Sequence, residues 1–320
     1  MMKSVLAKPL SLLLKTSVAT GALVGGTVLL AYTFQNNLLY YPTIPNKLPR
    51  TNEVGFRHPG EANLDYDNVY LTTPDGLQLH GWFIKTKENY ETAPTIVVFQ
   101  GRAGNIGHRV PFLAALEKYC KSNLFIIGYR GYSYSEGKPS EKGIKSDSLT
   151  TLDYVFSRKD IDTSKIFVLG SSMGGAVSVY GVTKTPHSVR GVILENTFTS
   201  MADMVSVVVP KLATVVNNYI MLHKWESVKH IHKIKAPICF ISGLDDKLIP
   251  PTHTKNLFKA STAAAFKQIV EVENGTHNET WSLGEEKYFS GLKEFMDKCL
   301  AEYQPVVAKE TVKVDEKSTV

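Results

Sequence analysis

Cysteine is scarce in this sequence, which has only Cys120, Cys239 and Cys299 among its 320 residues. Three widely spaced cysteines form neither a disulfide framework nor a C-x-x-C metal motif, so we expect buried free thiols. Runs of basic residues are also absent, although the formal net charge is +6. The lysines and arginines are scattered among the acids, which argues against a nucleic-acid partner and favours solubility or weak attraction to anionic membranes.

Acidic residues are missing from the N-terminal part of the chain until Glu53, and the longest apolar run lies there. The run Thr16–Phe34 is uncharged and about long enough to cross a ~30 Å hydrocarbon core. Lys3, Lys8 and Lys15 precede it. Positive charge on this side predicts a membrane anchor over residues 1–37, with the N-terminus in the cytoplasm or matrix and the globular domain opposite.

Three other interpretations of this apolar run stay open. A cleaved signal peptide usually has a shorter apolar core, whereas an acid-free segment with Lys and Ser resembles a mitochondrial targeting sequence. A core helix of a soluble domain is the third. We therefore predict a single-pass membrane protein of the endomembrane system or the mitochondrion. The sequons at Asn274 and Asn278 do not decide the side of the membrane, because a sequon is only a possible glycan acceptor.

The remaining chain divides by composition. Prolines punctuate residues 38–60, which we interpret as a linker, and no internal repeat follows. Residues 61–302 have the composition of one globular domain. Residues 303–320 are rich in Lys, Glu and Val without a helical stripe, so we predict a disordered tail.

Strand and helix patterns alternate within this domain. The expected strands are Val69–Thr72, Leu77–Ile84, Thr95–Phe99, Leu124–Gly128, Ile166–Gly170, Gly191–Glu195, Ile238–Ser242 and Gln268–Val272. The expected helices are Arg109–Tyr119, Lys142–Phe156, Gly174–Val182, Thr254–Ala260 and Trp281–Glu302. Continuous apolar runs between helices predict an α/β fold whose mostly parallel, eight-stranded sheet has helices on both faces. The interval 196–235 breaks the alternation and predicts a small helical cap.

The strongest chemical motif is G-x-S-x-G, formed by Gly170, Ser172 and Gly174. It follows an expected strand and opens an expected helix, which is the context of a nucleophile elbow. The glycines are needed because the serine sits in a tight, strained turn. Ser171 does not fit this role, since Leu169 occupies the position of its glycine. A glycine-eased turn without chemistry is the alternative.

A serine nucleophile needs a base and an acid, in the chain order Ser, Asp, His. Asp245 and Asp246 follow one expected strand, and His277 follows the last. Carboxyl ends of parallel strands converge, so these loops can meet. We regard the other histidines as packing or surface residues. His230 and His232 form a His-x-His pair with no acid or thiol nearby, so the sequence predicts neither a metal nor another cofactor.

An oxyanion hole needs two backbone N–H groups that face the developing negative charge. Met173, directly after the nucleophile, is one candidate. Arg102, in the glycine-rich turn after Thr95–Phe99, is the other. That turn could instead cradle a phosphate, but it has neither the Walker spacing with its lysine nor the G-x-G-x-x-G order.

With these motifs, the chain from about Leu38 to Leu300 resembles the α/β-hydrolase superfamily. Within it, the sequence is similar to the membrane-anchored group that includes alpha/beta hydrolase domain-containing protein thirteen and fungal bud-emergence proteins. The resemblance rests on A-G-N-I-G-H-R, Y-R-G-Y-S-Y-S-E-G-K-P-S-E, G-S-S-M-G-G-A, L-E-N-T-F-T-S and G-T-H-N-E-T-W.

The resemblance implies an α/β-hydrolase fold and a serine hydrolase with nucleophile Ser172, acid Asp246 and base His277. The pattern G-x-x-D-x-x-[IV]-P maps the acid onto Asp246 and leaves Asp245 as the alternative. The family often begins its oxyanion turn with H-G-N, whereas this chain has Gln100, Gly101 and Arg102. Backbone donation does not depend on the side chain, so the hole should persist.

We therefore predict a membrane-anchored serine hydrolase that cleaves esters or thioesters through an acyl-enzyme. The apolar cap stretch Met204–Val216 and the anchor favour a lipid-like or acylated substrate, although core packing explains the stretch equally well. Thioesters enter by analogy with protein depalmitoylases. The alternative is a catalytically silent scaffold or interaction protein at a membrane, with protein partners undetermined; such proteins typically lack a member of the triad.

Overall fold

The computed structural model describes residues 26–30, 32–43 and 52–305. Most of the predicted anchor, part of the linker and residues 306–320 of the predicted tail therefore lie outside the described residues. Residues 26–30, 32 and 33 are helical, and α2 (Gln35–Leu39) follows them. Within these ranges, no helix combines the length and the apolar character that a membrane span requires.

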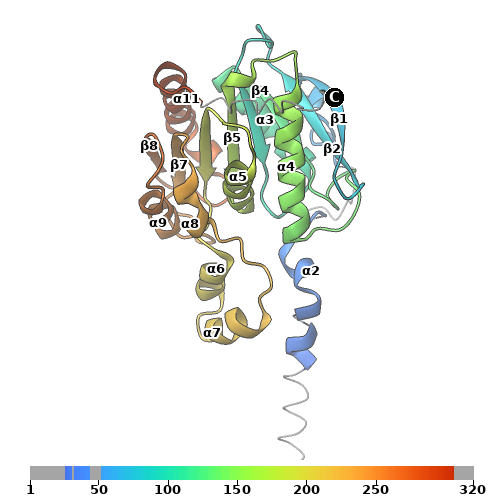
Figure 1. Ribbon diagram of the computed structural model, residues 1–320, viewed down its shortest axis with the longest axis vertical. Helices are drawn as coiled ribbons and strands as arrows, with labels where there is room; N and C mark the ends of the chain where they lie inside the picture. The colour runs from blue at the N-terminus through green and yellow to red at the C-terminus, as the bar shows by residue number, and fades with distance from the viewer. Residues whose placement is uncertain (1–25, 31, 44–51, 306–320) are drawn as a thin grey trace, which may run out of the picture.

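An eight-stranded sheet forms the centre of the molecule (Figure 1). Its strands are β1 (Asp65–Thr72), β2 (Gln78–Lys85), β3 (Thr95–Phe99), β4 (Asn123–Ile127), β5 (Ile166–Ser171), β6 (Gly191–Glu195), β7 (Ile238–Gly243) and β8 (Lys267–Val272). They lie in the order β1-β2-β4-β3-β5-β6-β7-β8, and only the pairs β1/β2 and β2/β4 are antiparallel. The structure confirms the predicted fold class.

Helices cover both faces of this sheet (Figure 1). One layer holds α4 (Glu141–Ser157), α5 (Met173–Lys184), α8 (Ser227–His230) and α9 (Thr252–Ala260), and the other holds α3 (Val110–Cys120) and α11 (Glu285–Glu302). Successive side chains of a strand point to opposite faces. Val97 and Phe99 accordingly pack in one hydrophobic core, and Ile96 and Val98 in the other. Burial on both faces explains why the central strands are continuous apolar runs.

The last predicted helix is two helices in the structure, so the prediction of one continuous helix over Trp281–Glu302 was wrong. The short α10 (Thr280–Leu283) ends one residue before Gly284, and α11 begins one residue after it. Gly284 lies against β8, where an added Cβ would come within 2.1 Å of the Val272 side chain. The chain bends at this close contact.

The three cysteines are free and buried, as predicted.

A small lobe follows β6 and holds α6 (Met201–Val208), α7 (Ala213–Val215) and a π-helical turn (Val216–Ile220). Figure 1 shows this lobe and the N-terminal helical residues projecting from the same end of the molecule. The Gln35 side chain joins them, since it donates to the Ile220 carbonyl at 3.2 Å and accepts from the Leu222 N–H at 2.8 Å. The lobe is therefore held beside the N-terminal helix.

Candidate active site

Ser172 occupies a strained turn between β5 and α5. Its φ is 56° and its ψ is −122°, a conformation that non-glycine residues rarely adopt. The flanking glycines are required by close approach. A Cβ on Gly170 would lie 2.3 Å from the Gly174 carbonyl oxygen, and one on Gly174 would lie 1.9 Å from the Phe99 carbonyl oxygen. The geometry is that of a nucleophile elbow.

His277 and Asp246 reach this serine from two other loops at the carboxyl end of the sheet. The His277 Nε2 lies 3.0 Å from the Ser172 Oγ, and the His277 Nδ1 lies 2.7 Å from an Asp246 carboxylate oxygen. Because the carboxylate accepts only, Nδ1 carries the proton and Nε2 presents a lone pair to the hydroxyl. The three residues predicted as a triad therefore form one continuous chain of hydrogen bonds.

Asp246, rather than its neighbour Asp245, faces the histidine. The Asp246 side chain is buried, and its other oxygen accepts the N–H groups of Leu248 and Ile249, both at 2.8 Å. These bonds hold the carboxylate in one orientation. Asp245 is exposed and is fixed through its backbone, whose N–H donates to the Gly275 carbonyl at 3.0 Å.

The predicted oxyanion donors lie on either side of the nucleophile. Met173 is the first residue of α5, where N–H groups have no partner within the helix. On the opposite side, Gly101 packs close to the serine, since a Cβ there would lie 3.4 Å from the Ser172 Cβ. Arg102 follows Gly101 in the chain, and its N–H donates to no acceptor in the described residues. Both amides are thus available to a ligand beside Ser172.

The loop that carries Arg102 is fixed by its carbonyl group. That oxygen accepts the Tyr132 hydroxyl at 2.7 Å and the Tyr41 N–H at 3.0 Å. The Arg102 guanidinium stacks over the Tyr41 ring at 5.0 Å. Residues just after the N-terminal helix thereby position one of the two candidate oxyanion donors.

Asn196 ties the acid loop to the histidine loop, a role that we did not predict. Its side-chain NH₂ donates to the His277 carbonyl at 3.2 Å and the Thr280 hydroxyl at 2.9 Å, while its oxygen accepts the Gly243 N–H at 2.8 Å. The motif L-E-N-T-F-T-S contains Asn196, but nothing in its local pattern indicates contacts this far along the chain.

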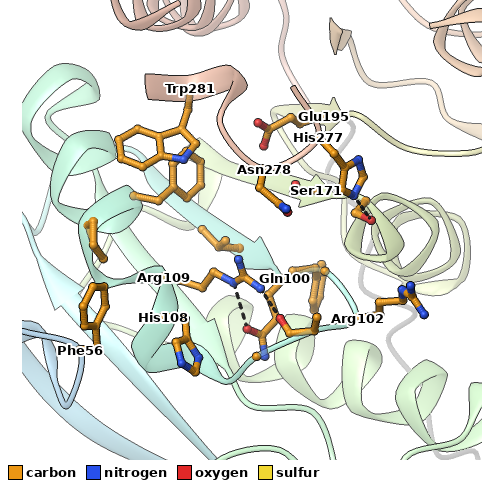
Figure 2. Close-up of a pocket in the computed structure, with 18 of the residues that line it drawn as sticks. Phe56, Gln100, Arg102, His108, Arg109, Ser171, Glu195, His277, Asn278 and Trp281 are labelled. Carbon is orange, nitrogen blue, oxygen red and sulfur yellow. Dashed lines mark hydrogen bonds between the residues drawn. The ribbon is translucent and has the colours of Figure 1, made fainter. Parts of the chain in front are cut away.

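A cavity of about 840 Å³ opens beside the serine. Figure 2 shows Arg109, Gln100 and His108 gathered on one side of it, with His277 on another. Glu195 also lines the cavity. Burial raises the pKa of its carboxyl group to about 7, and the Ser171 hydroxyl offsets part of this rise. Our reading of the sequence missed both Arg109 and Glu195 as site residues.

No metal centre accompanies this site in the parts of the chain that the structure describes. They contain no group of three His, Cys, Asp or Glu side chains arranged to hold a metal ion. His230 and His232 lie on α8 and the turn after it, away from the cavity wall.

Comparison with known sequences gives consistent results. The sequence profile of the prolyl oligopeptidase family matches residues 128–300. The alpha/beta hydrolase domain-containing protein WAV2 of Arabidopsis thaliana is 39% identical, with 91% of this chain and 94% of that protein covered. Protein bem46 of Schizosaccharomyces pombe is 35% identical, with 83% and 86% covered.

A solved structure supports the fold. The Pyrococcus furiosus esterase Pf2001 superimposes with a TM-score of 0.65 at 18% sequence identity, and the match covers 81% of this chain and 98% of the esterase. At this identity the similarity is evidence for the fold alone. The sequence relatives and the shared fold agree with the resemblance to α/β-hydrolases that the motifs indicate.

Proposed function

Because this chain belongs to the prolyl oligopeptidase family of α/β-hydrolases, we propose that it is a membrane-anchored serine hydrolase that cleaves esters or thioesters. One observation carries this proposal: Ser172, His277 and Asp246 form an unbroken chain of hydrogen bonds at 3.0 and 2.7 Å. A scaffold protein has no need for a strained serine beside an oriented imidazole.

In this mechanism the Ser172 Oγ attacks the acyl carbon while the His277 Nε2 takes the hydroxyl proton. The carbonyl electrons move onto oxygen, where the Met173 and Arg102 N–H groups stabilise the negative charge. Collapse of the intermediate breaks the bond to the alcohol or thiol, which leaves with the proton from His277. Water then repeats these steps on the acyl-enzyme and releases the acid.

The small lobe after β6, which lies within the predicted cap, supports a location at a membrane, where acylated and lipid-like substrates are found. Within residues 204–222 the only charged residue is Lys211. Several apolar side chains of this stretch are exposed rather than packed in the core, namely Val207, Val208, Val209, Leu212, Val215, Tyr219 and Leu222. Exposed apolar residues also line the neighbouring N-terminal helix, namely Leu29, Leu30, Phe34 and Leu38. An apolar surface of this kind fits the interface of a bilayer.

Fluorophosphonate labelling of the full chain in mild detergent tests the catalytic part of this proposal. The probe reacts with an activated serine, so we expect labelling of the native protein and none of Ser172→Ala. We also expect Ser172→Ala to lower hydrolysis of ester substrates by at least about a thousandfold. A folded native protein that does not react would instead support a catalytically silent scaffold. Matched ester, thioester and amide substrates would then rank the acyl bonds that the enzyme cleaves.

Extraction of membranes from expressing cells at alkaline pH tests the anchor. The apolar run Thr16–Phe34 predicts that the full chain stays with the membrane pellet, as an integral protein does. Deletion of residues 1–37 should move the protein toward the soluble fraction. Release of the full chain by alkali would contradict the anchor while leaving the hydrolase proposal untouched.

A further inference from the structure

Arg109 lies at the wall of the active-site cavity and forms no ion pair with a carboxylate of the described residues. Its Nε donates to the Gln100 side-chain oxygen at 3.4 Å, and one terminal nitrogen donates to the Ala103 carbonyl at 2.5 Å. Among the described residues, no carboxylate lies within 4.0 Å of this guanidinium. The group has five N–H donors, so most of its donor capacity is unused. A largely buried charge without a counter-ion is costly, and its presence beside a cavity points to a ligand.

Two more donors without partners lie in the same wall. The His108 Nδ1 accepts the Asn105 N–H at 3.0 Å, so the proton of the neutral ring is on Nε2. In the described structure, this Nε2 and the side-chain nitrogen of Gln100 are buried without a hydrogen-bond partner. Burial, together with the charge of Arg109, lowers the pKa of His108 and keeps the ring neutral. Gln100, His108 and Arg109 thus offer several donors without partners, whereas the Gln100 side-chain oxygen and the Ala103 carbonyl already accept from Arg109.

The acidic residues of the cavity do not compensate this wall. Glu53 lies at its exposed margin, where water screens its charge. Glu195 is buried, and at neutral pH a large part of it carries a proton because burial raises its pKa to about 7. The charges of Glu195 and Arg109 attract each other across the cavity, but burial outweighs this attraction in the pKa of both groups. Among the described residues, neither Glu53 nor Glu195 forms an ion pair with Arg109 within 4.0 Å.

We propose that Arg109, with Gln100 and His108, binds an anionic group of the substrate, a carboxylate or a phosphate. The enzyme would therefore act on esters or thioesters that carry an acidic group away from the bond that is cleaved. This inference rests on the proposed hydrolase function. Phe112 and Trp281, with ring centroids 5.7 Å apart, line the same cavity and would contact the apolar part of such a substrate.

A pair of esters of equal chain length tests this inference. Para-nitrophenyl hexanoate is neutral, and mono-para-nitrophenyl adipate ends in a carboxylate. A bidentate pair with a desolvated arginine predicts that the native full chain prefers the adipate by about tenfold or more in kcat/KM. The preference should appear mainly in KM. Arg109→Gln should bring the ratio of the two esters close to one, and Arg109→Lys should keep part of it.

Lys247→Gln is the matched control, since it removes an exposed positive charge one residue from Asp246 and should keep the preference for the adipate. If this variant loses the preference as Arg109→Gln does, a diffuse field is responsible and the inference fails. If Arg109→Gln lowers kcat/KM equally for both esters, Arg109 has a structural role and the inference fails.

Protection of Ser172 from the fluorophosphonate probe gives a readout that needs no variant. Adipate and hexyl phosphate should slow labelling of the native protein, whereas hexanol at the same concentration should not. The stronger of the two anions identifies the source of the charge. Labelling that none of the anions slows would overturn this inference and leave the hydrolase proposal standing. A protein that does not label at all would refute the hydrolase proposal itself.

Discussion

Two arginines in this molecule lie in opposite electrostatic environments. Arg130 is buried and donates to Asp147 and Asp75 through all three of its guanidinium nitrogens, at 2.8 to 3.1 Å. Arg109 lies in the wall of the active-site cavity and contacts only neutral oxygens of the described residues. The first arginine completes the fold, and the second leaves its charge available to a ligand.

This difference separates structural charges from functional ones. The Asp147 side chain is fully buried and also accepts the Arg130 backbone N–H at 2.9 Å, so the pair joins the loop after β4 to α4. Breaking a buried pair leaves an uncompensated charge, whereas removing an unpaired charge leaves none. The stability of variants should therefore distinguish the two arginines.

The largest effect is expected for Arg130→Met. This change would leave the Asp147 carboxylate buried without its partner, so we expect the free energy of unfolding to fall by about 3 to 5 kcal/mol. Thermal unfolding of the full chain in mild detergent, followed by tryptophan fluorescence, would measure it. The double variant Arg130→Met, Asp147→Leu is the control and should recover much of the loss. If Arg130→Met alone melts close to the temperature of the native protein, Arg130 is not a structural residue and the difference between the two arginines does not hold.

An intermediate effect is expected for Glu195→Gln, and it depends on pH. The pKa of Glu195 is about 7 in the folded protein and 4.5 as its ordinary value. A raised pKa means that its contribution to stability is complete below pH 4.5 and is lost as the pH rises through 7. Between pH 4.5 and pH 7, the free energy of unfolding of the native protein should thus fall by up to about 3 kcal/mol relative to that of Glu195→Gln.

Melting temperatures of both proteins at acidic and mildly alkaline pH would measure this loss. As the pH rises, the melting temperature of the native protein should fall relative to that of Glu195→Gln. The opposite trend, with Glu195→Gln less stable at high pH, would mean that Glu195 is an ionised partner of Arg109 in the folded protein. Arg109 would then be a paired residue like Arg130, and the comparison would fail.

Local patterns predicted the central part of the site. The fold class follows from alternating apolar runs, and Ser172 follows from glycines that a tight turn requires on both sides. His277 follows from chain order, because strand ends meet at one edge of the sheet. Chain order leaves Asp245 and Asp246 both open, and only the resemblance to the family pattern G-x-x-D-x-x-[IV]-P selects Asp246. The structure places these three residues in one chain of hydrogen bonds.

Roles that depend on distant partners were not visible in the sequence. Arg109 and Arg130 each stand in a glycine-containing motif, G-H-R and Y-R-G, and nothing local tells which one has an acidic partner. Asp75 and Asp147 lie 55 and 17 residues from Arg130 along the chain. Asn196 was missed for the same reason, since its contacts lie in two other loops.

The smallest effect is expected for Arg109→Met, which completes the comparison. The variant loses two hydrogen bonds to neutral oxygens but also a desolvated charge, whose burial lowers its pKa. These contributions oppose each other, so we expect the free energy of unfolding to change by less than about 1 kcal/mol in either direction. The measurement is the same thermal unfolding as for Arg130→Met, with Arg109→Lys as the charge-conserving control. A loss as large as that of Arg130→Met would make Arg109 a structural residue, and the anion preference of the enzyme would then need another origin.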